Sequence, residues 1–204
     1  MAQVEKTRAP QQDRSKNRYN EILNATKDLI LERGSAQLKI QDIAKRAGST
    51  TGAIYRYFPN KHAIIEALLA QYFDSFDTMI PIELIEINSV EEMVEVLQNG
   101  YDQVYQLHEA EPVLRDLLAS GAADKKIQQY DLADSRKRAK AIFLSSRHLF
   151  PPENWPQLEQ YLLLILHVVT PAIHMVLSLE PEEREGMVKL NKSWASVEFF
   201  SKFL

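Results

Sequence analysis

The sequence contains no cysteine, and its 204 residues include only six glycines and nine prolines. Without cysteine, the chain can form no disulfide, no thiolate metal site and no cysteine nucleophile. It also lacks a glycine-rich phosphate loop, a cluster of metal ligands and a recognisable nucleophile–base pair, so we expect neither an enzyme nor a cofactor. No apolar signal region stands at the polar N-terminus, which predicts a cytoplasmic protein.

Negative charge is in slight excess, but its distribution is more informative than the net value of −4. Residues 1–62 contain twelve Lys or Arg and six Asp or Glu, whereas residues 63–204 contain twelve and twenty-two. A basic part joined to an acidic remainder directs one end of a molecule toward phosphate groups. The charge pattern is therefore a first indication that the N-terminal part binds nucleic acid.

Apolar residues make up 45% of the chain and recur at helical spacing, with no competing strand pattern. This periodicity predicts an all-α fold of about nine helices. Residues 1–15 are polar and lack periodicity, so we expect a flexible basic arm there. A three-helix domain is predicted over residues 16–62 and a larger helical domain over residues 63–204.

Two short helices separated by a tight turn are predicted within residues 40–58. An apolar face marks residues 40–47, and Gly48 ends this first helix. Thr50 is suited to cap a second helix that runs to Phe58. This is the arrangement of a helix-turn-helix, in which the second helix enters the major groove of DNA and its N-terminal residues meet base edges.

The segment over residues 16–65 resembles the DNA-binding domain of TetR-type transcriptional regulators. The residues that carry the resemblance are Ile22-Leu23-Asn24-Ala25, Gly34, Ile43-Ala44, Ala47-Gly48 and the run TGAIYRYFPNK from Thr51 to Lys61. The resemblance implies that bases and phosphates are contacted by Thr50, Thr51, Gly52, Tyr55 and Tyr57. It also implies that Lys61 grips the DNA backbone and that Arg56, at a variable position, sets sequence preference.

Two residues depart from the family pattern. Lys39 stands where the family usually has a threonine that caps the helix and binds phosphate, so we expect a phosphate contact from Lys39 but doubt a capping role. His62 replaces the commoner acidic residue. Alternatives also stay open inside the motif, because Tyr55 and Tyr57 are suited to packing as well as to phosphate contact. Gly52 allows a close approach either of the two helices or of DNA.

The C-terminal part is rich enough in apolar residues to form an interface between two copies of the chain. We predict a homodimer through the helices at about 157–179 and 182–204, which would pair two DNA-binding modules on a pseudo-palindromic operator in double-stranded DNA. The stretch from Tyr161 to Leu179 is also near the length of a membrane span. Its internal Pro171 and its acidic flanks favour a soluble core helix, so we expect no membrane partner.

The TetR resemblance implies a small-molecule effector site in the C-terminal part, which makes residues 63–204 a ligand-binding and dimerisation domain. Candidate lining residues on inward faces are Tyr101, Tyr105, His108 and Phe143, for which an ordinary core role is an equal alternative. His167 and His174 lie seven residues apart on one helical face and are candidate ligand contacts, although hydrogen-bonded core histidines are the simpler reading. The run at residues 136–140, near Asp131 and Asp134, is predicted to be an exposed basic strip.

Taken with the resemblance, these features predict a sequence-specific DNA-binding regulator, a repressor that a small-molecule effector of unknown identity releases from its operator. The alternative is a helix-turn-helix protein without an effector, acting as an architectural protein or as an activator.

Overall fold

The computed structural model describes residues 9–79, 86–121 and 124–204, and every regular element in these ranges is helical. The predicted all-α class is thus confirmed. The α-helices are α1 (Ala9–Arg33), α2 (Ile40–Arg46), α3 (Thr51–Tyr57), α4 (Lys61–Met79), α5 (Val90–Ala110), α6 (Pro112–Gly121), α7 (Lys125–Ser146), α8 (Trp155–Leu177), α9 (Pro181–Lys192) and the single turn α10 (Val197–Phe200).

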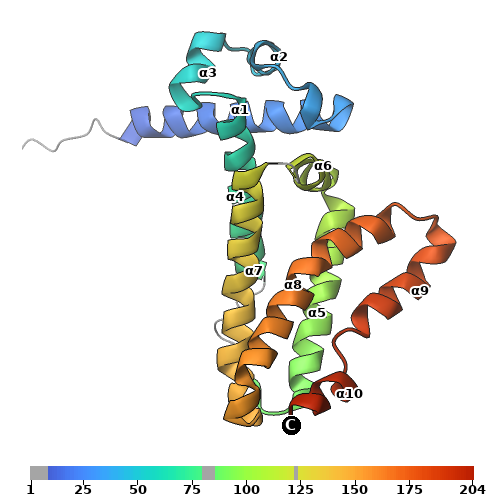
Figure 1. Ribbon diagram of the computed structural model, residues 1–204. Coiled ribbons are helices and arrows are strands. Elements are labelled where there is room, and N and C mark those ends of the chain that lie inside the picture. Colours follow the sequence, from blue (N-terminus) through green and yellow to red (C-terminus); the bar gives the residue numbers. More distant parts are fainter. Residues whose placement is uncertain (1–8, 80–85, 122–123) are drawn as a thin grey trace, which may run out of the picture.

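Helices α1–α3 form a head at one end of the molecule, and the remaining helices form a body (Figure 1). Helix α4 leaves the head and runs into the body, where α5, α7 and α8 extend away from the head and α9 lies to one side (Figure 1). One hydrophobic cluster joins the head to α4 and α6, and it includes Ile22, Ile43, Ile54, Leu68 and Leu117. A second cluster fills the space between α5, α7, α8 and the C-terminal end. The head and the start of the body therefore share one core.

Local caps explain where several helices begin. The hydroxyl oxygen of Ser89 accepts a hydrogen bond from the backbone N–H of Glu92 at 3.1 Å, and the Asp124 carboxylate accepts from that of Lys126 at 2.9 Å. Asn60 accepts in the same way from the Ala63 N–H at 2.9 Å, at the start of α4. The caps satisfy N–H groups that have no partner inside the helix. Serine, aspartate and asparagine are among the residue types preferred at this position.

Two boundaries differ from the sequence-based expectation. Helix α1 begins at Ala9, so it takes in the second half of the expected arm; Lys6 and Arg8 lie outside the described residues. A proline in the first turn of a helix costs little, which lets Pro10 lie inside α1. The expected helix over 182–204 is divided, because α9 ends at Lys192 and the Ser196 hydroxyl caps α10 by accepting from the Phe199 N–H at 3.2 Å.

Helix α8 has an apolar outward face. The side chains of Leu164 and Met175 are 57% and 47% exposed, and Pro171 is exposed between them. Among the described residues, the segment Pro152–Leu177 is the one helical stretch long and apolar enough to cross a membrane, and 22% of its most apolar window is buried. Apolar surface of this extent is the mark of a contact with another apolar surface.

Candidate functional site

One face of helix α3 packs on the core and the opposite face is exposed to solvent. Its N-cap Thr50 accepts a hydrogen bond from the Ala53 N–H at 3.2 Å, while Ile54 and Phe58 are buried in the core shared by the head and α4. The side chain of Tyr55 is 53% exposed. These contacts fix the helix and leave one face of it open to solvent. We call Thr50, Thr51, Gly52, Tyr55 and Arg56 the outer face of α3; all five are exposed.

The other predicted DNA-contacting residues surround this face unevenly. Tyr57 is half-buried against the core, and its hydroxyl lies 3.5 Å from the Ser15 hydroxyl. Lys39 is exposed at the N-cap of α2 without a side-chain cap hydrogen bond, in line with the doubt about its capping role. Lys61 is half-buried in the first turn of α4. The two tyrosines therefore differ: Tyr57 packs against the core, whereas Tyr55 is exposed and is not among the described residues that pack there.

Glycines shape the motif in two ways. Gly48 adopts a φ of 56°, in the left-handed region that glycine reaches without steric cost, and it makes the turn between α2 and α3. At Gly52, by contrast, an added Cβ would meet no atom within 4 Å. Packing within the chain therefore gives no reason for a glycine at this point of the outer face.

Ion pairs reduce the charge of some basic residues in the head. The Arg46 guanidinium lies 2.7 Å from both carboxylate oxygens of Glu32. The two opposite charges compensate each other, so Arg46 adds no net positive charge to the surface of α2. Arg18 is paired with Glu21 at 2.8 Å. Within the described part of the chain, four cations in the head or at the start of α4 make no ion pair: Lys39, Lys45, Arg56 and Lys61.

A second candidate site is a cavity of about 100 Å³ inside the body. Helices α4 to α8 line it, and most of the lining is apolar, with Phe73, Leu97, Val104, Leu118 and Leu166 among the walls. Of the six residues predicted for an effector site, Tyr101 and His108 line this cavity. Phe143 instead packs edge-on against Trp155, and Tyr105 stacks beside Tyr101. A volume of this size requires a small ligand or some movement of the walls.

The histidines form hydrogen-bonded pairs. His108 Nδ1 lies 3.0 Å from His174 Nε2, and His167 Nδ1 lies 3.1 Å from the Ser135 hydroxyl. Burial, together with the nearby His174 and Arg115, lowers the pKa of His108 to about 3. Burial also lowers the pKa of His174. The pair between α5 and α8 is therefore neutral at physiological pH.

The expected exposed basic strip on α7 is wrong at one position. The Arg138 side chain is buried, and its Nε donates to Asp134 Oδ2 at 2.8 Å. The i to i+4 spacing of the two residues allows the pair to form within one helix. Burial of a guanidinium requires such a partner, because an unpaired charge is strongly disfavoured inside a protein. Arg138 and Asp134 thus belong to the wall of the cavity.

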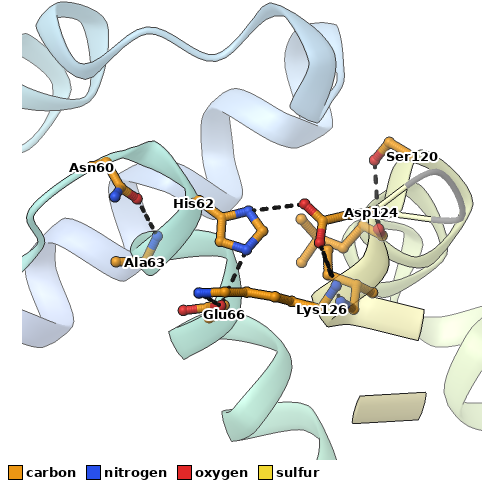
Figure 2. Close-up of polar contacts among 9 residues, drawn as sticks. Asn60, His62, Ala63, Glu66, Ser120, Asp124 and Lys126 are labelled. Carbon is orange, nitrogen blue, oxygen red and sulfur yellow. Dashed lines mark hydrogen bonds and ion pairs between the residues drawn. The ribbon is translucent and has the colours of Figure 1, made fainter. Parts of the chain in front are cut away.

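Figure 2 shows where α4 meets the start of α7. His62, in the first turn of α4, lies between two carboxylates: its Nε2 is 3.1 Å from Glu66 and its Nδ1 is 3.3 Å from Asp124, the cap of α7. Lys126 reaches Glu66 from the other side at 3.4 Å. The sequence marked His62 only as unusual, and its contact between α4 and α7 comes from the fold. We call His62, Glu66, Asp124 and Lys126 the α4–α7 junction.

Two family models match the chain. The model described as bacterial regulatory proteins, tetR family, matches residues 22–68, which include α2 and α3. The model described as tetracyclin repressor-like, C-terminal domain, matches residues 91–200, more than half of the chain. The two matches coincide with the head and with most of the body.

Curated relatives match part of the chain. The fatty acid metabolism regulator protein of Bacillus subtilis is 37% identical over 59 residues, which are 29% of this chain and 30% of that protein. The transcriptional repressor KstR of Rhodococcus jostii is 35% identical over 63 residues, 31% of this chain and 30% of that protein. The chain thus spans less than a third of the length of these curated relatives.

A solved structure matches nearly the whole chain. It is SmeT, the repressor of the Stenotrophomonas maltophilia multidrug efflux pump SmeDEF, with a TM-score of 0.68 and 20% identity over 91% of this chain and 89% of that one. Identity at this level shows a shared fold.

Proposed function

Because the chain belongs to the TetR family of bacterial regulatory proteins, we propose that it is a dimeric transcriptional repressor that a small molecule releases from its operator. The observation that carries the proposal is the outer face of α3, which is held rigidly from below and has no partner in the described chain that would cover it. A helix presented in this way fits the major groove, whose base edges are read by side chains near the N-terminus of the helix.

The outer face of α3 is chemically suited to DNA. It offers hydroxyl groups from Thr50, Thr51 and Tyr55, which can donate to phosphate oxygens, and the Arg56 guanidinium, which can bind guanine through two hydrogen bonds. The open space above Gly52 supports the second of its two sequence-based roles, a close approach of the DNA backbone. Attraction over longer distances would come from the neighbouring cations Lys39, Lys45 and Lys61.

The apolar outward face of α8 supports a dimer. Leu164 and Met175 are exposed on α8. Exposed apolar side chains also lie on α9, on α10 and in the segment between these two helices: Leu190, Val197 and Trp194. In a dimer with a two-fold axis, the same side chains of the second copy would cover these side chains, as in a four-helix interface. Two heads held in this way could bind successive major grooves, about 34–36 Å apart.

Helix α4 supports a path from the cavity to the head. Its first half carries Ile64 and Leu68 in the core shared with the head, while Tyr72 and Phe73 line the cavity. The Tyr72 hydroxyl donates to Glu111 at 3.0 Å, and this bond ties α4 to the end of α5. A ligand that favours a different position of α4 would change the separation of the two heads and so shift the population away from the DNA-binding state.

Selection of bound duplexes from a random DNA library tests the proposal. The full-length chain is expected to enrich a pseudo-palindrome whose half-sites are about one helical turn apart. If sequencing shows no enriched motif, the proposed function is wrong, because non-specific binding by cationic residues enriches nothing.

Tyr55→Ala separates DNA reading from the fold. We expect it to weaken binding to the selected duplex by about 10- to 100-fold, as for the loss of a good side-chain contact to DNA, while sedimentation shows an unchanged dimer. Tyr130→Ala is the matched control, since the Tyr130 side chain is 50% exposed on α7 against 53% for Tyr55. Equal losses in the two variants would exclude Tyr55 as a DNA contact.

A further inference from the structure

The polar residues of the cavity are concentrated on α7. Asp131, Asp134, Ser135 and Arg138 line it from successive turns of that helix, and the other polar groups of the lining belong to Thr170, His108 and the hydroxyls of Tyr72 and Tyr101. The opposite walls are aliphatic and aromatic, from α4, α5 and α6. A ligand that fills this space therefore has an apolar body and one polar end directed to α7.

The charges of this wall do not cancel. Asp134 and Arg138 neutralise each other through the bond of 2.8 Å between Oδ2 and Nε. His108 is neutral, because burial lowers its pKa to about 3. Among the described residues, Asp131 is left as a carboxylate with no Lys or Arg at ion-pair distance, so this wall carries an excess of one negative charge.

The contacts of Asp131 leave its carboxylate short of donors. In the described chain its closest basic neighbour is His167, whose Nδ1 lies 3.8 Å from Oδ2, beyond hydrogen-bond distance. The Ser135 hydroxyl is bonded instead to the main-chain oxygen of Asp131 and to His167. The Asp131 side chain is 30% exposed, and burial raises the pKa of its carboxyl group. The charged form of Asp131 is therefore poorly solvated at this position. A cation placed beside it would remove that penalty.

From this arrangement we propose that the effector is a small organic cation, a protonated amine on an aryl or alkyl body, whose nitrogen lies against the Asp131 carboxylate. The inference rests on the proposed function, which makes the cavity the effector site. The rings of Phe73 and Tyr101 line the same space, and aromatic faces also attract cations.

Two other ligand classes fit less well. A carboxylate would meet the excess negative charge of α7, and the Arg138 guanidinium is already engaged with Asp134 through Nε and Nη2. A neutral alcohol could donate one hydrogen bond to Asp131, but it would leave the charge uncompensated. The apolar walls accept all three classes equally, so the head group decides among them.

A matched series isolates the head group. Phenylbutylamine, phenylbutanol and phenylpentanoate share a phenyl ring on the same length of methylene chain and carry a positive, a neutral and a negative end at neutral pH. Isothermal titration calorimetry of the full-length dimer is expected to give the lowest Kd for the amine, by about 10- to 100-fold over the alcohol, the range for a charge-assisted hydrogen bond in a partly buried site. Tighter binding of the alcohol or of the acid would overturn the inference, and so would the absence of binding by all three.

Asp131→Asn tests the residue itself. This variant keeps the shape of the side chain and removes its charge, so the advantage of the amine over the alcohol should disappear, while the Kd of the alcohol changes less than threefold or so. Glu95→Gln, which removes one charge from an exposed position on α5, controls for the net charge of the body. An unchanged preference for the amine in Asp131→Asn would contradict the assignment, and thermal unfolding checks that the variant is folded.

Measurements of operator binding distinguish a failure of the amine inference from a failure of the proposed function. The enriched duplex is tested without any ligand and then with each of the three compounds. Specific binding that only the alcohol or the acid releases would sustain the proposed function and overturn the amine, whereas the absence of specific binding would overturn the function itself.

Discussion

His108 and His174 are a pair of neutral imidazoles held in contact between α5 and α8. Because burial lowers the pKa of His108 to about 3, the folded chain takes up no proton there between pH 6.5 and 4, whereas the unfolded chain does. The unfolded state therefore binds more protons in this range, and the free energy of unfolding falls as the pH falls. We expect His108 alone to account for a loss of about 2 kcal/mol between pH 6.5 and 5.

Urea unfolding, followed by circular dichroism at fixed protein concentration across this pH range, measures the loss. His108→Gln keeps a hydrogen-bonding group beside His174 and removes the titration, so its stability should depend less steeply on pH. His148→Gln is the control, since His148 is exposed at the far end of the body. Parallel pH profiles for the native chain and His108→Gln would contradict the assignment.

Among the helices, the ones that the sequence predicted well are those fixed by local contacts. Thr50 caps α3 through a group three residues away, and Asn60 and Asp124 act over the same short range. The division between α9 and α10 was missed because contacts distant in the sequence fix it. There Gln98 donates to the Ala195 carbonyl oxygen at 2.9 Å and the Tyr161 hydroxyl donates to that of Trp194 at 2.6 Å.

The outward face of α8 leads to a prediction about assembly. Leu164→Asp places two carboxylates, one from each copy, at the centre of the proposed interface, where they lose solvation. We expect the dimer dissociation constant to rise roughly a hundredfold or more, and sedimentation velocity at micromolar concentration should then show a monomer. Leu31→Asp, at a position 59% exposed on α1 against 57% for Leu164, should leave the dimer intact. If Leu164→Asp is still a dimer, the interface does not include this face of α8 and lies on another surface.

At the scale of the molecule, the head could be predicted and the cavity largely could not. The outer face of α3 lies within seven residues, so one motif contains it. The cavity collects residues from five helices, and an inward face looks the same in sequence whether it meets a cavity or a packed core. The sequence could therefore not distinguish Tyr101 and His108, which line the cavity, from Phe143, which is part of the packed core. Arg138 was misread because a charged run is usually solvated, although its spacing from Asp134 was the available signal.

The α4–α7 junction connects these two regions. Asp131 lies seven residues, or about two helical turns, after Asp124 on α7, and Asp124 contacts His62 on α4 (Figure 2). A cation bound at Asp131 would therefore act on the end of α7 that touches α4, and α4 shares its core with the head. By linkage, the factor by which the ligand weakens operator binding equals the factor by which the operator weakens ligand binding.

His62→Ala should reduce that factor. Removal of the imidazole breaks the direct contact between α4 and the cap of α7, so the ratio of operator Kd values with and without saturating phenylbutylamine should fall by about fivefold or more, within the usual range of coupling energies. Fluorescence anisotropy of a labelled operator gives this ratio, and calorimetry with and without operator gives the reciprocal one. Lys126→Ala is the control from the same junction, because the Lys126 side chain is 73% exposed and an exposed ion pair contributes little. If His62→Ala and Lys126→Ala leave the ratio equally unchanged, the signal passes from body to head by the contacts of α6 with α1 and with the turn after α1 instead. One such contact is the hydrogen bond of 2.8 Å from the Ser35 N–H, in that turn, to Asp116 on α6.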